Sequence, residues 1–481
     1  MGKPFIHLVN TPNSAYFLDV NKDEIVPISF DAYAYLSNVM NDEIEWDVTS
    51  VAELSNLYDQ GFLSIDSNVK TVQHSFTEHY EIFLHRNLSK IALQLTQDCN
   101  FRCKYCVYSE NSSSLQRSHS VKSMTWDTAK RAIDFLWNHS VDSKDIFIAF
   151  YGGEPLMNFP LMKEVIDYSK KRFWGKKITF NITTNGSLLS DDVILYLAEQ
   201  NVNIMISLDG PKDINDANRI TANGEGTYDI VIARINRINE LLPDYAKHLS
   251  ISMVMDPVND FDCFNTVMLN NFDMERMRLQ PSLIDRSFDD ATSSFSHDFI
   301  WKREYQLFLT VLSYMSRIST KETSLLLEKG FNLNLKEFSD YNIKTDLFPI
   351  DSPSGPCIPG CSRLFTTVDG DLFPCERVSE TSPAMCIGTI DTGFDMSKSM
   401  NMLNVASITS DSCCECWCFR YCMMCAKHAD NGSSDLSKHT RLSFCSKHKV
   451  TANEKIKLYI LIKESLYYYS KQTRQPRKDV Q

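Results

Sequence analysis

Short apolar runs alternate with amphipathic stretches between residues 91 and 279 of the chain. The runs are rich in β-branched and aliphatic residues and predict six strands, at residues 91–95, 146–150, 178–182, 202–207, 249–255 and 277–279. The stretches between them predict helices at residues 125–138, 161–173, 191–200, 227–242 and 262–269. Alternation at this spacing is typical of βαβ units around a parallel sheet. We therefore expect an α/β fold, a partial (β/α)6 barrel of the TIM type, with functional residues on the loops that follow the strands.

The flanking parts of the chain follow other patterns. Residues 5–9, 15–20 and 25–28 are typical of short strands, and residues 29–41 and 49–59 of helices, so a small three-stranded sheet with helices precedes the barrel. The expected organisation is an N-terminal domain at 1–85, the barrel at 86–284, a bridging helical segment without a recognisable motif at 285–345, and a cysteine-rich domain with the C-terminal tail at 346–481.

Composition restricts the class of protein. Hydrophobic residues make up 43% and charged residues 23% of the chain, which is typical of a globular protein with sizeable cores. The net charge of −12 argues against nucleic-acid binding, because such binding releases counterions through a basic surface. No run approaches 18 apolar residues and the first residues lack a signal-peptide core, so we expect a cytoplasmic protein without a membrane partner. Fifteen cysteines in such a chain indicate bound metal rather than disulfides.

Three cysteines follow the first predicted barrel strand. Cys99, Cys103 and Cys106 have the spacing C-x3-C-x2-C and open the loop that leaves the strand, so their thiolates can surround one inorganic centre. A four-iron cluster needs four ligands, and three cysteines leave one iron open to a substrate or cofactor. A zinc knuckle or three buried thiols are the alternatives.

This spacing, with Tyr105 before the last cysteine, resembles the radical S-adenosylmethionine superfamily. The resemblance implies that the open iron chelates S-adenosylmethionine, which electron transfer cleaves to a 5′-deoxyadenosyl radical; an external donor such as flavodoxin or ferredoxin supplies the electron. Gly152, Gly153 and Glu154 look like the family segment that holds the methionyl amino group. By the same analogy Ser207 and Arg219 contact the ribose or carboxylate, and Met255 packs on adenine or lies in the core.

Eleven cysteines lie between residues 357 and 445, in an order that resembles the SPASM extension of that superfamily. The resemblance implies two auxiliary four-iron clusters, three clusters in all. Their implied ligands are Cys357, Cys361, Cys375 and Cys425 for the first, and Cys413, Cys416, Cys422 and Cys445 for the second. In the central run, two residues separate the last two cysteines, Cys422 and Cys425, where the family has three. Cys361 is either a ligand or a free thiol. The remaining cysteines stay unassigned: Cys263, Cys386, Cys414 and Cys418. Bound zinc is the alternative.

The N-terminal residues resemble the winged-helix-like recognition element (RRE) of enzymes that modify ribosomally made peptides, which adds a leader peptide to a sheet edge. We therefore expect a maturase for a precursor peptide. Of the reactions possible for such an enzyme, we favour the formation of thioether crosslinks between a cysteine sulfur and a carbon of another residue. An anaerobic sulfatase-maturating enzyme that makes formylglycine is the alternative, for which Glu376 stands where that family places a proton acceptor. A non-catalytic iron–sulfur scaffold or a DNA-binding sensor is an alternative of another class.

Overall fold

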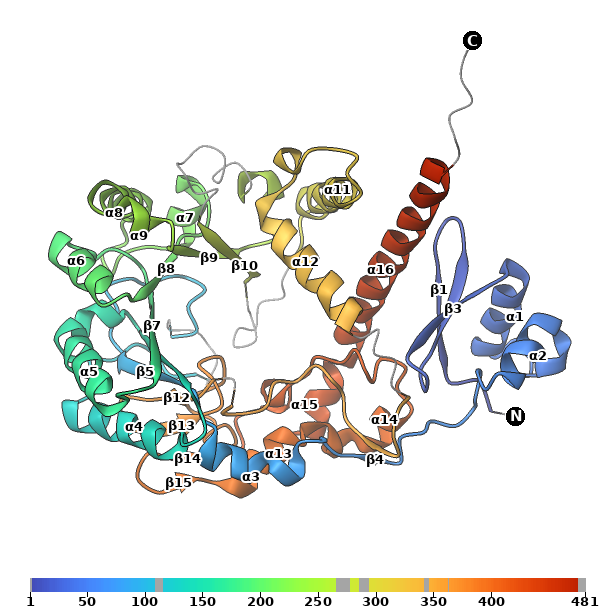
Figure 1. Cartoon of the computed structure of the whole chain (residues 1–481), viewed down its shortest axis with the longest axis horizontal. Coiled ribbons are helices and arrows are strands. Elements are labelled where there is room, and N and C mark those ends of the chain that lie inside the picture. The colour runs from blue at the N-terminus through green and yellow to red at the C-terminus, as the bar shows by residue number, and fades with distance from the viewer. Residues whose placement is uncertain are drawn as a thin grey trace, which may run out of the picture.

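The N-terminal residues form a separate small sheet with two helices on one face (Figure 1). The computed structural model describes residues 2–108, 116–264, 277–284, 294–340, 346–361 and 363–474. Strands β1 (Ile6–Asn10), β2 (Ala15–Asp19) and β3 (Glu24–Ile28) make an antiparallel meander, followed by α1 (Phe30–Met40) and α2 (Ala52–Asp59). The three strands and two helices predicted there are present; the winged-helix likeness stays a prediction.

Six parallel strands form the body of the chain, each close to its predicted position. They are β5 (Lys90–Thr96), β6 (Asp145–Gly152), β7 (Lys177–Thr184), β8 (Asn203–Ser207), β9 (Ser250–Met255) and β10 (Arg278–Leu283), and each pairs with the next in sequence. The mixed α/β fold is therefore confirmed. Helices α4 (Trp126–His139), α5 (Phe159–Arg172), α6 (Asp191–Glu199), α7 (Lys212–Asn218), α8 (Tyr228–Leu241) and α9 (Pro243–Ala246) connect the strands. Most of the helix expected at 262–269 lies outside the described residues.

Burial explains these strands, because their inward side chains alternate with less buried ones. In β6, Ile146, Ile148 and Phe150 are buried and the residues between them are only partly so, a period of two. Helices then cover the sheet with amphipathic faces, and the largest core of the described residues is continuous across strands and helices.

The cysteine-rich region continues the same sheet. Strand β12 (Phe365–Thr366) pairs in parallel with β5, and β13 (Asp371–Phe373), β14 (Gly388–Thr389) and β15 (Gly393–Phe394) extend it antiparallel into ten strands. The short helices α13 (Met396–Leu403), α14 (Ser410–Cys414) and α15 (Lys438–Ser443) complete this region, and β11 (Ile350–Asp351) pairs with β4 (Thr71–Val72). Backbone pairing therefore crosses the boundary expected between the barrel and the cysteine-rich domain.

Long helices join the parts. Helix α11 (His297–Tyr314) precedes α12 (Leu325–Asp340), which contacts both β10 and α16 (Cys445–Arg474). Helix α16 in turn runs beside the N-terminal sheet (Figure 1), where Ile456 and Ile460 pack on Val9 and Leu18. Helix α3 (Thr77–Arg86) leads from the N-terminal part to β5. Among the helices of the described ranges, none is both long and apolar enough to cross a membrane.

Candidate functional site

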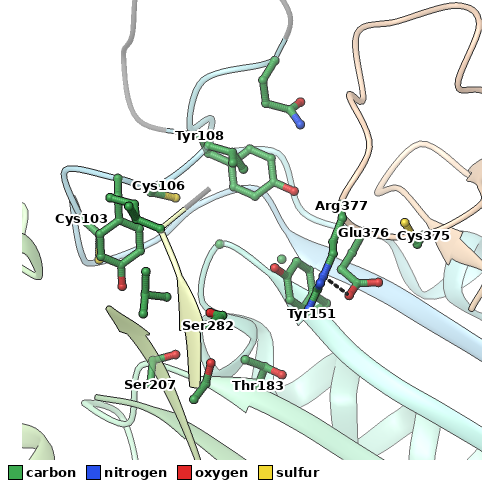
Figure 2. A pocket seen from close by; sticks show the side chains of 18 of the residues that line it. Cys103, Cys106, Tyr108, Tyr151, Thr183, Ser207, Ser282, Cys375, Glu376 and Arg377 are labelled. Carbon is green, nitrogen blue, oxygen red and sulfur yellow. Dashed lines mark ion pairs between the residues drawn. The ribbon is translucent and has the colours of Figure 1, made fainter. Parts of the chain in front are cut away.

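A cavity of about 870 Å³, here called the central cavity, lies at the carboxyl ends of the parallel strands. Residues from the ends of five strands line it: Tyr151, Thr184, Ser207, Val254 and Ser282. One wall carries Cys99, Cys103 and Cys106, and the opposite wall carries Cys357, Cys375 and Cys425. In the view of Figure 2, Tyr108 and Tyr151 lie between the two groups of thiols. The cavity therefore combines cysteines that are more than 250 positions apart in the sequence.

The first cysteine loop is fixed by backbone contacts with the residues after α7. Arg102 N donates to Ile220 O at 2.7 Å, and Lys104 N donates to Asn218 O at 2.9 Å. At the start of the loop, Asp98 accepts a hydrogen bond from Cys99 N at 2.8 Å. These contacts hold the loop on both sides, and its three thiols line the cavity.

Two glycines at the end of β6 allow the backbone of the cysteine loop to approach closely. A Cβ at Gly153 would lie 2.0 Å from Asp98 O, and one at Gly152, whose φ is +141°, would lie 2.3 Å from Thr96 O. Gly153 N donates to Thr96 O at 2.9 Å. Both glycines line the central cavity. These glycines therefore allow close approach of the protein's own loop, and their expected contact with S-adenosylmethionine stays a prediction.

A buried cluster of polar side chains connects the cysteine loop to β8. Arg219 Nη1 donates to the Tyr105 hydroxyl at 2.5 Å, and Tyr105 donates in turn to the Asp209 carboxylate, which lies 3.7 Å from Arg219. Arg219 lines the cavity, and its Nε has no hydrogen-bond partner among the described residues. A buried donor without a partner fits an anionic ligand group, as expected for the carboxylate of S-adenosylmethionine. Ser207 lines the same part of the cavity.

Glu154 and Met255 are not among the residues that line the central cavity. The buried Glu154 carboxylate accepts hydrogen bonds from Thr184 Oγ1 and Asn185 N, both at 2.7 Å, and burial raises its pKa. These contacts tie the ends of β6 and β7 together. Met255 is part of the main hydrophobic core. The expected contacts of Glu154 with the methionyl amino group and of Met255 with adenine stay predictions.

Cys361 is the one cysteine of its expected set that does not line the central cavity, although its thiol interacts with that of Cys357. Cys357, Cys375 and Cys425 line the central cavity, whereas Cys361 is 8% exposed and packs in the main hydrophobic core near Tyr80. Burial raises the pKa of Cys361 to about 12 and that of Cys375 to about 11. A bound cation reverses this effect on a ligating thiol, because the metal stabilises the thiolate. Three of the four expected thiols therefore line this wall, and the ligand role of Cys361 stays a prediction.

A second cavity of about 240 Å³ lies beside α16. Five cysteines line it: Cys413, Cys416, Cys418, Cys422 and Cys445. Four of them are the set expected for the second auxiliary cluster, and the fifth, Cys418, is 2% exposed and one of the thiols left unassigned from the sequence. Around both cavities of the described part of the chain, no three possible ligand side chains meet closely enough to hold a single metal ion.

Glu376 lines the central cavity beside Cys375 and is held by two arginines (Figure 2). Its carboxylate forms an ion pair with Arg363 Nη1 and lies 3.9 Å from Arg377 Nε. The carboxylate is thus positioned by charge pairing at the cavity wall, and its expected role as a proton acceptor stays a prediction.

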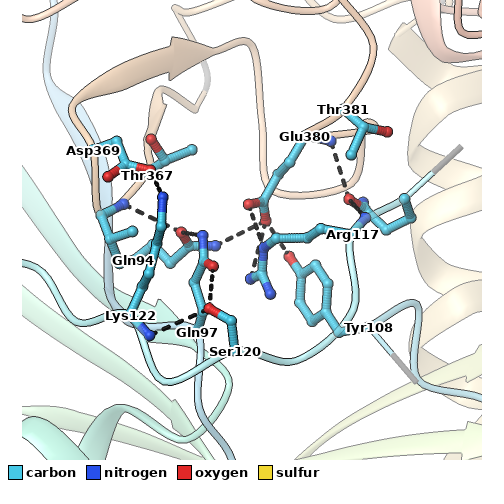
Figure 3. Close-up of polar contacts among 12 residues, drawn as sticks. Gln94, Gln97, Tyr108, Arg117, Ser120, Lys122, Thr367, Asp369, Glu380 and Thr381 are labelled. Atoms are coloured by element: carbon cyan, nitrogen blue, oxygen red, sulfur yellow. Dashed lines mark hydrogen bonds and ion pairs between the residues drawn. The ribbon is translucent and has the colours of Figure 1, made fainter. Parts of the chain in front are cut away.

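The two walls of the cavity are joined by a polar network that sequence reasoning missed (Figure 3). Glu380 accepts hydrogen bonds from Tyr108 at 2.7 Å and from Gln94 at 2.8 Å, and its other oxygen pairs with Arg117 Nε at 2.7 Å. The Arg117 guanidinium lies 3.9 Å above the Tyr108 ring. No residue pattern in the sequence connects residues 108 and 117 with residue 380, so only the fold reveals this junction.

Replacing Glu380 with alanine is expected to destabilise the protein by about 3 kcal/mol, because it leaves the largely buried Arg117 side chain, 13% exposed, without its carboxylate partner. The thermal unfolding midpoint of the anaerobic holoprotein measures the loss. Lys122→Ala is the matched control: it breaks an ion pair with Asp369 across the same junction, but both side chains are more than half exposed, so about 1 kcal/mol or less is expected. Equal midpoints for the two variants would contradict this account.

Comparison with known proteins identifies a family whose model matches part of the chain. Residues 93–268 match the model of the radical SAM superfamily. The chain is 26% identical over 245 residues to the radical SAM cyclopropyl synthase TigE of Paramaledivibacter caminithermalis, a match that covers 48% of this chain and 49% of that protein. It is 25% identical over 310 residues to the cysteine-type anaerobic sulfatase-maturating enzyme of Clostridium novyi, covering 60% of this chain and 74% of that enzyme.

Among solved structures, native anSMEcpe with bound AdoMet and Kp18Cys peptide superposes with a TM-score of 0.53 at 20% identity, over 76% of this chain and 99% of that one. This likeness concerns the fold. The sequence match spans only about half of the cyclopropyl synthase. The chain therefore contains a radical SAM domain, as expected from its first cysteine motif, and its named relatives are enzymes.

Proposed function

We propose that this radical SAM enzyme modifies a ribosomally made precursor peptide, most simply by joining a cysteine sulfur to a carbon of another residue. Three four-iron clusters are its proposed metal centres: one at Cys99, Cys103 and Cys106, one at the opposite wall of the central cavity, and one in the second cavity. The observation that carries the proposal is that one cavity faces both of the first two groups of thiols.

Bound S-adenosylmethionine and its cluster supply a carbon-centred radical that takes a hydrogen atom from the substrate. The residues of this chain then have separate tasks. Arg219 and Ser207 bind and orient S-adenosylmethionine, Tyr105 and Asp209 fix the arginine, and the strand ends exclude water from the reacting atoms.

The proposed thioether replaces one S–H and one C–H bond of the peptide, so two electrons and two protons leave the substrate. One hydrogen atom leaves with the 5′-deoxyadenosyl fragment, and the other electron and proton need an acceptor at the same cavity. The wall of Cys357, Cys375 and Cys425 is suited to hold such an acceptor. With Cys361 in the core, this wall also leaves a place for the peptide thiolate.

Formylglycine formation is the second candidate, because one relative named above is a cysteine-type anaerobic sulfatase-maturating enzyme. That reaction replaces the cysteine sulfur with oxygen, whereas a thioether keeps the sulfur and loses two hydrogen atoms. Mass spectrometry of a peptide encoded beside this gene, after anaerobic turnover, separates the two. A product that lacks sulfur would overturn the thioether proposal and favour the sulfatase-maturase reaction.

The N-terminal sheet is proposed to bind the leader part of the precursor. Its outer strands β1 and β3 each pair with β2 on one side only within the described residues, so both present backbone groups to an added strand. One face is covered by α1 and α2 and the other by α16, which leaves the edges rather than the faces for a peptide.

Deleting residues 2–65 is expected to weaken binding of the full-length precursor by at least about 10-fold, because the added-strand contacts are lost. Cleavage of S-adenosylmethionine without peptide is expected to continue, since none of these residues lines the central cavity. Anisotropy of a labelled precursor measures the first and release of 5′-deoxyadenosine the second. Because α16 loses its partner face, circular dichroism must first establish that the shortened chain is folded. Normal precursor binding by the folded truncation would refute the leader-binding role.

A further inference from the structure

Positive side chains are concentrated on the wall of the central cavity that the cysteine-rich region supplies. Arg363, Arg377, Lys427 and Lys447 line it, and Glu376 is the acidic side chain among them. The chain as a whole has a net charge of −12, so this local excess of cations runs against its general composition. A cavity lined by one sign of charge focuses the field and attracts a ligand of the opposite sign.

The two arginines share one carboxylate. Glu376 pairs with Arg363 and Arg377, and its side chain is 13% exposed, whereas those of Arg363 and Arg377 are 53% and 72% exposed. The carboxylate carries one negative charge and the two guanidinium groups carry two positive charges. This group of side chains therefore has a net positive charge at the cavity wall. In Figure 2, Arg377 extends beside Tyr151, toward the middle of the cavity.

Compensation of cluster charge is the competing explanation for these cations. It suits Arg363, whose positive charge acts on the Cys357 thiol. It does not account for Arg377, because a guanidinium that is mostly exposed is screened by solvent and does little for a buried thiolate. A guanidinium in that position is available to a carboxylate through two parallel hydrogen bonds.

We infer that the central cavity selects a peptide segment that carries a carboxylate close to the residue being modified, and that Arg363 and Arg377 bind this carboxylate. The inference rests on the proposed function, since it assumes that a peptide enters this cavity. The carboxylate belongs either to an acidic side chain or to the end of the peptide, and both present the same chemistry to the two arginines.

Equilibrium binding of short fluorescein-labelled peptides to the anaerobic holoenzyme tests the inference. The probes are Gly-Ser-Asp-Cys-Ser-Gly with an amidated end, the same peptide with Asn for Asp, and the Asn peptide with a free terminal carboxylate. We expect one of the two acidic probes to bind about 10-fold or more tightly than the neutral one. The Arg363→Gln/Arg377→Gln double variant is expected to lose this preference, and the Arg363→Lys/Arg377→Lys variant to keep part of it.

Arg131→Gln is the matched control, because it removes a surface arginine that pairs with Asp127 and Asp391 away from the cavity; wild-type preference is expected. Equal affinity for all three probes would overturn the inference and leave the proposed function standing. A double variant with unchanged preference but an altered reduction potential of the auxiliary cluster would also overturn it, by assigning the arginines to the cluster. Absence of any binding of these probes would overturn the inference alone, because they lack the leader on which the proposed function relies and which the precursor experiments test.

Discussion

Replacing Cys99, Cys103 and Cys106 together with alanine is expected to abolish the formation of 5′-deoxyadenosine. The three thiols line one wall of the central cavity on a loop fixed at both ends, and the radical SAM domain contains them. Without them the cluster that bears S-adenosylmethionine has no protein ligands, so an enhancement of at least about 10⁶-fold is expected to disappear. Reductive cleavage by the reconstituted protein, followed by chromatography, measures the loss.

The triple variant is also expected to retain about eight of about twelve iron atoms, because the other two sets of thiols are untouched. Cys263→Ala is the control, since Cys263 lines neither cavity and its thiol donates to Asp260 O at the start of its own helical segment. The control should keep full iron content and full cleavage activity. Continued cleavage by the triple variant would refute the assignment of the first cluster.

Replacing Cys375 with alanine is expected to stop peptide modification, whereas the same change at Cys361 is expected to leave iron content and modification near normal. Cys375 faces the central cavity beside Glu376, and Cys361 lies in the hydrophobic core. For Cys361→Ala we expect a cost of about 1 kcal/mol in stability, typical of a small deletion in a core. Iron analysis and mass spectrometry of the treated precursor measure the two effects.

Comparison of the two variants shows whether the cluster at the wall of Cys357, Cys375 and Cys425 has Cys361 as a fourth protein ligand. If Cys361→Ala lost iron as completely as Cys375→Ala, all four irons there would be bound by the protein, and the peptide thiol would react without ligation. Retention of iron only in the Cys361 variant leaves one position for the substrate. Electron paramagnetic resonance with and without a cysteine-containing peptide then reports whether the thiol changes the auxiliary signal.

The barrel could be predicted from the sequence because its signal is local. Strands β5 to β9 are short apolar runs in which every second side chain is buried, whereas β10 buries only Leu279; each predicted run lies within a few residues of the observed strand. The cysteine loop was predictable for the same reason, since Cys99, Cys103 and Cys106 lie within one short segment. The radical SAM domain then follows from residues 93–268.

Side-chain orientation was less predictable. The sequence places Glu154 next to two cavity glycines, but it does not indicate that Thr184 and Asn185 would bind its carboxylate from the next strand. Spacing likewise places Cys361 close to Cys357, but it does not indicate that Cys361 also packs in the main hydrophobic core and does not line the cavity. Contacts between distant segments decide both cases, and a pattern within one segment cannot encode them.

The network at Glu380 and the arginines around Glu376 also depend on contacts between distant segments, so the sequence did not predict them. Arg117 has no sequence neighbour that marks it as a buried counterion, and Arg363 and Arg377 flank Glu376 only once the strands β12 and β13 have paired. Cys418 was left unassigned because four other cysteines already satisfied the expected spacing; its place in the second cavity depends on the packing of α16. Such features follow from tertiary structure alone.

The pairing of β5 with β12 has a consequence for how the chain is made. Leu93 and Thr366 are register neighbours although they are more than 270 positions apart in the sequence. At translation rates of 5–20 residues per second, β12 emerges roughly 14–55 seconds after β5. Throughout that interval the first barrel strand has one bare edge, which is prone to pair with other nascent chains. Because this long-range contact forms slowly, a good yield of folded protein requires that the cysteine-rich end is synthesised without delay. It also requires that the edge of β5 is protected until then.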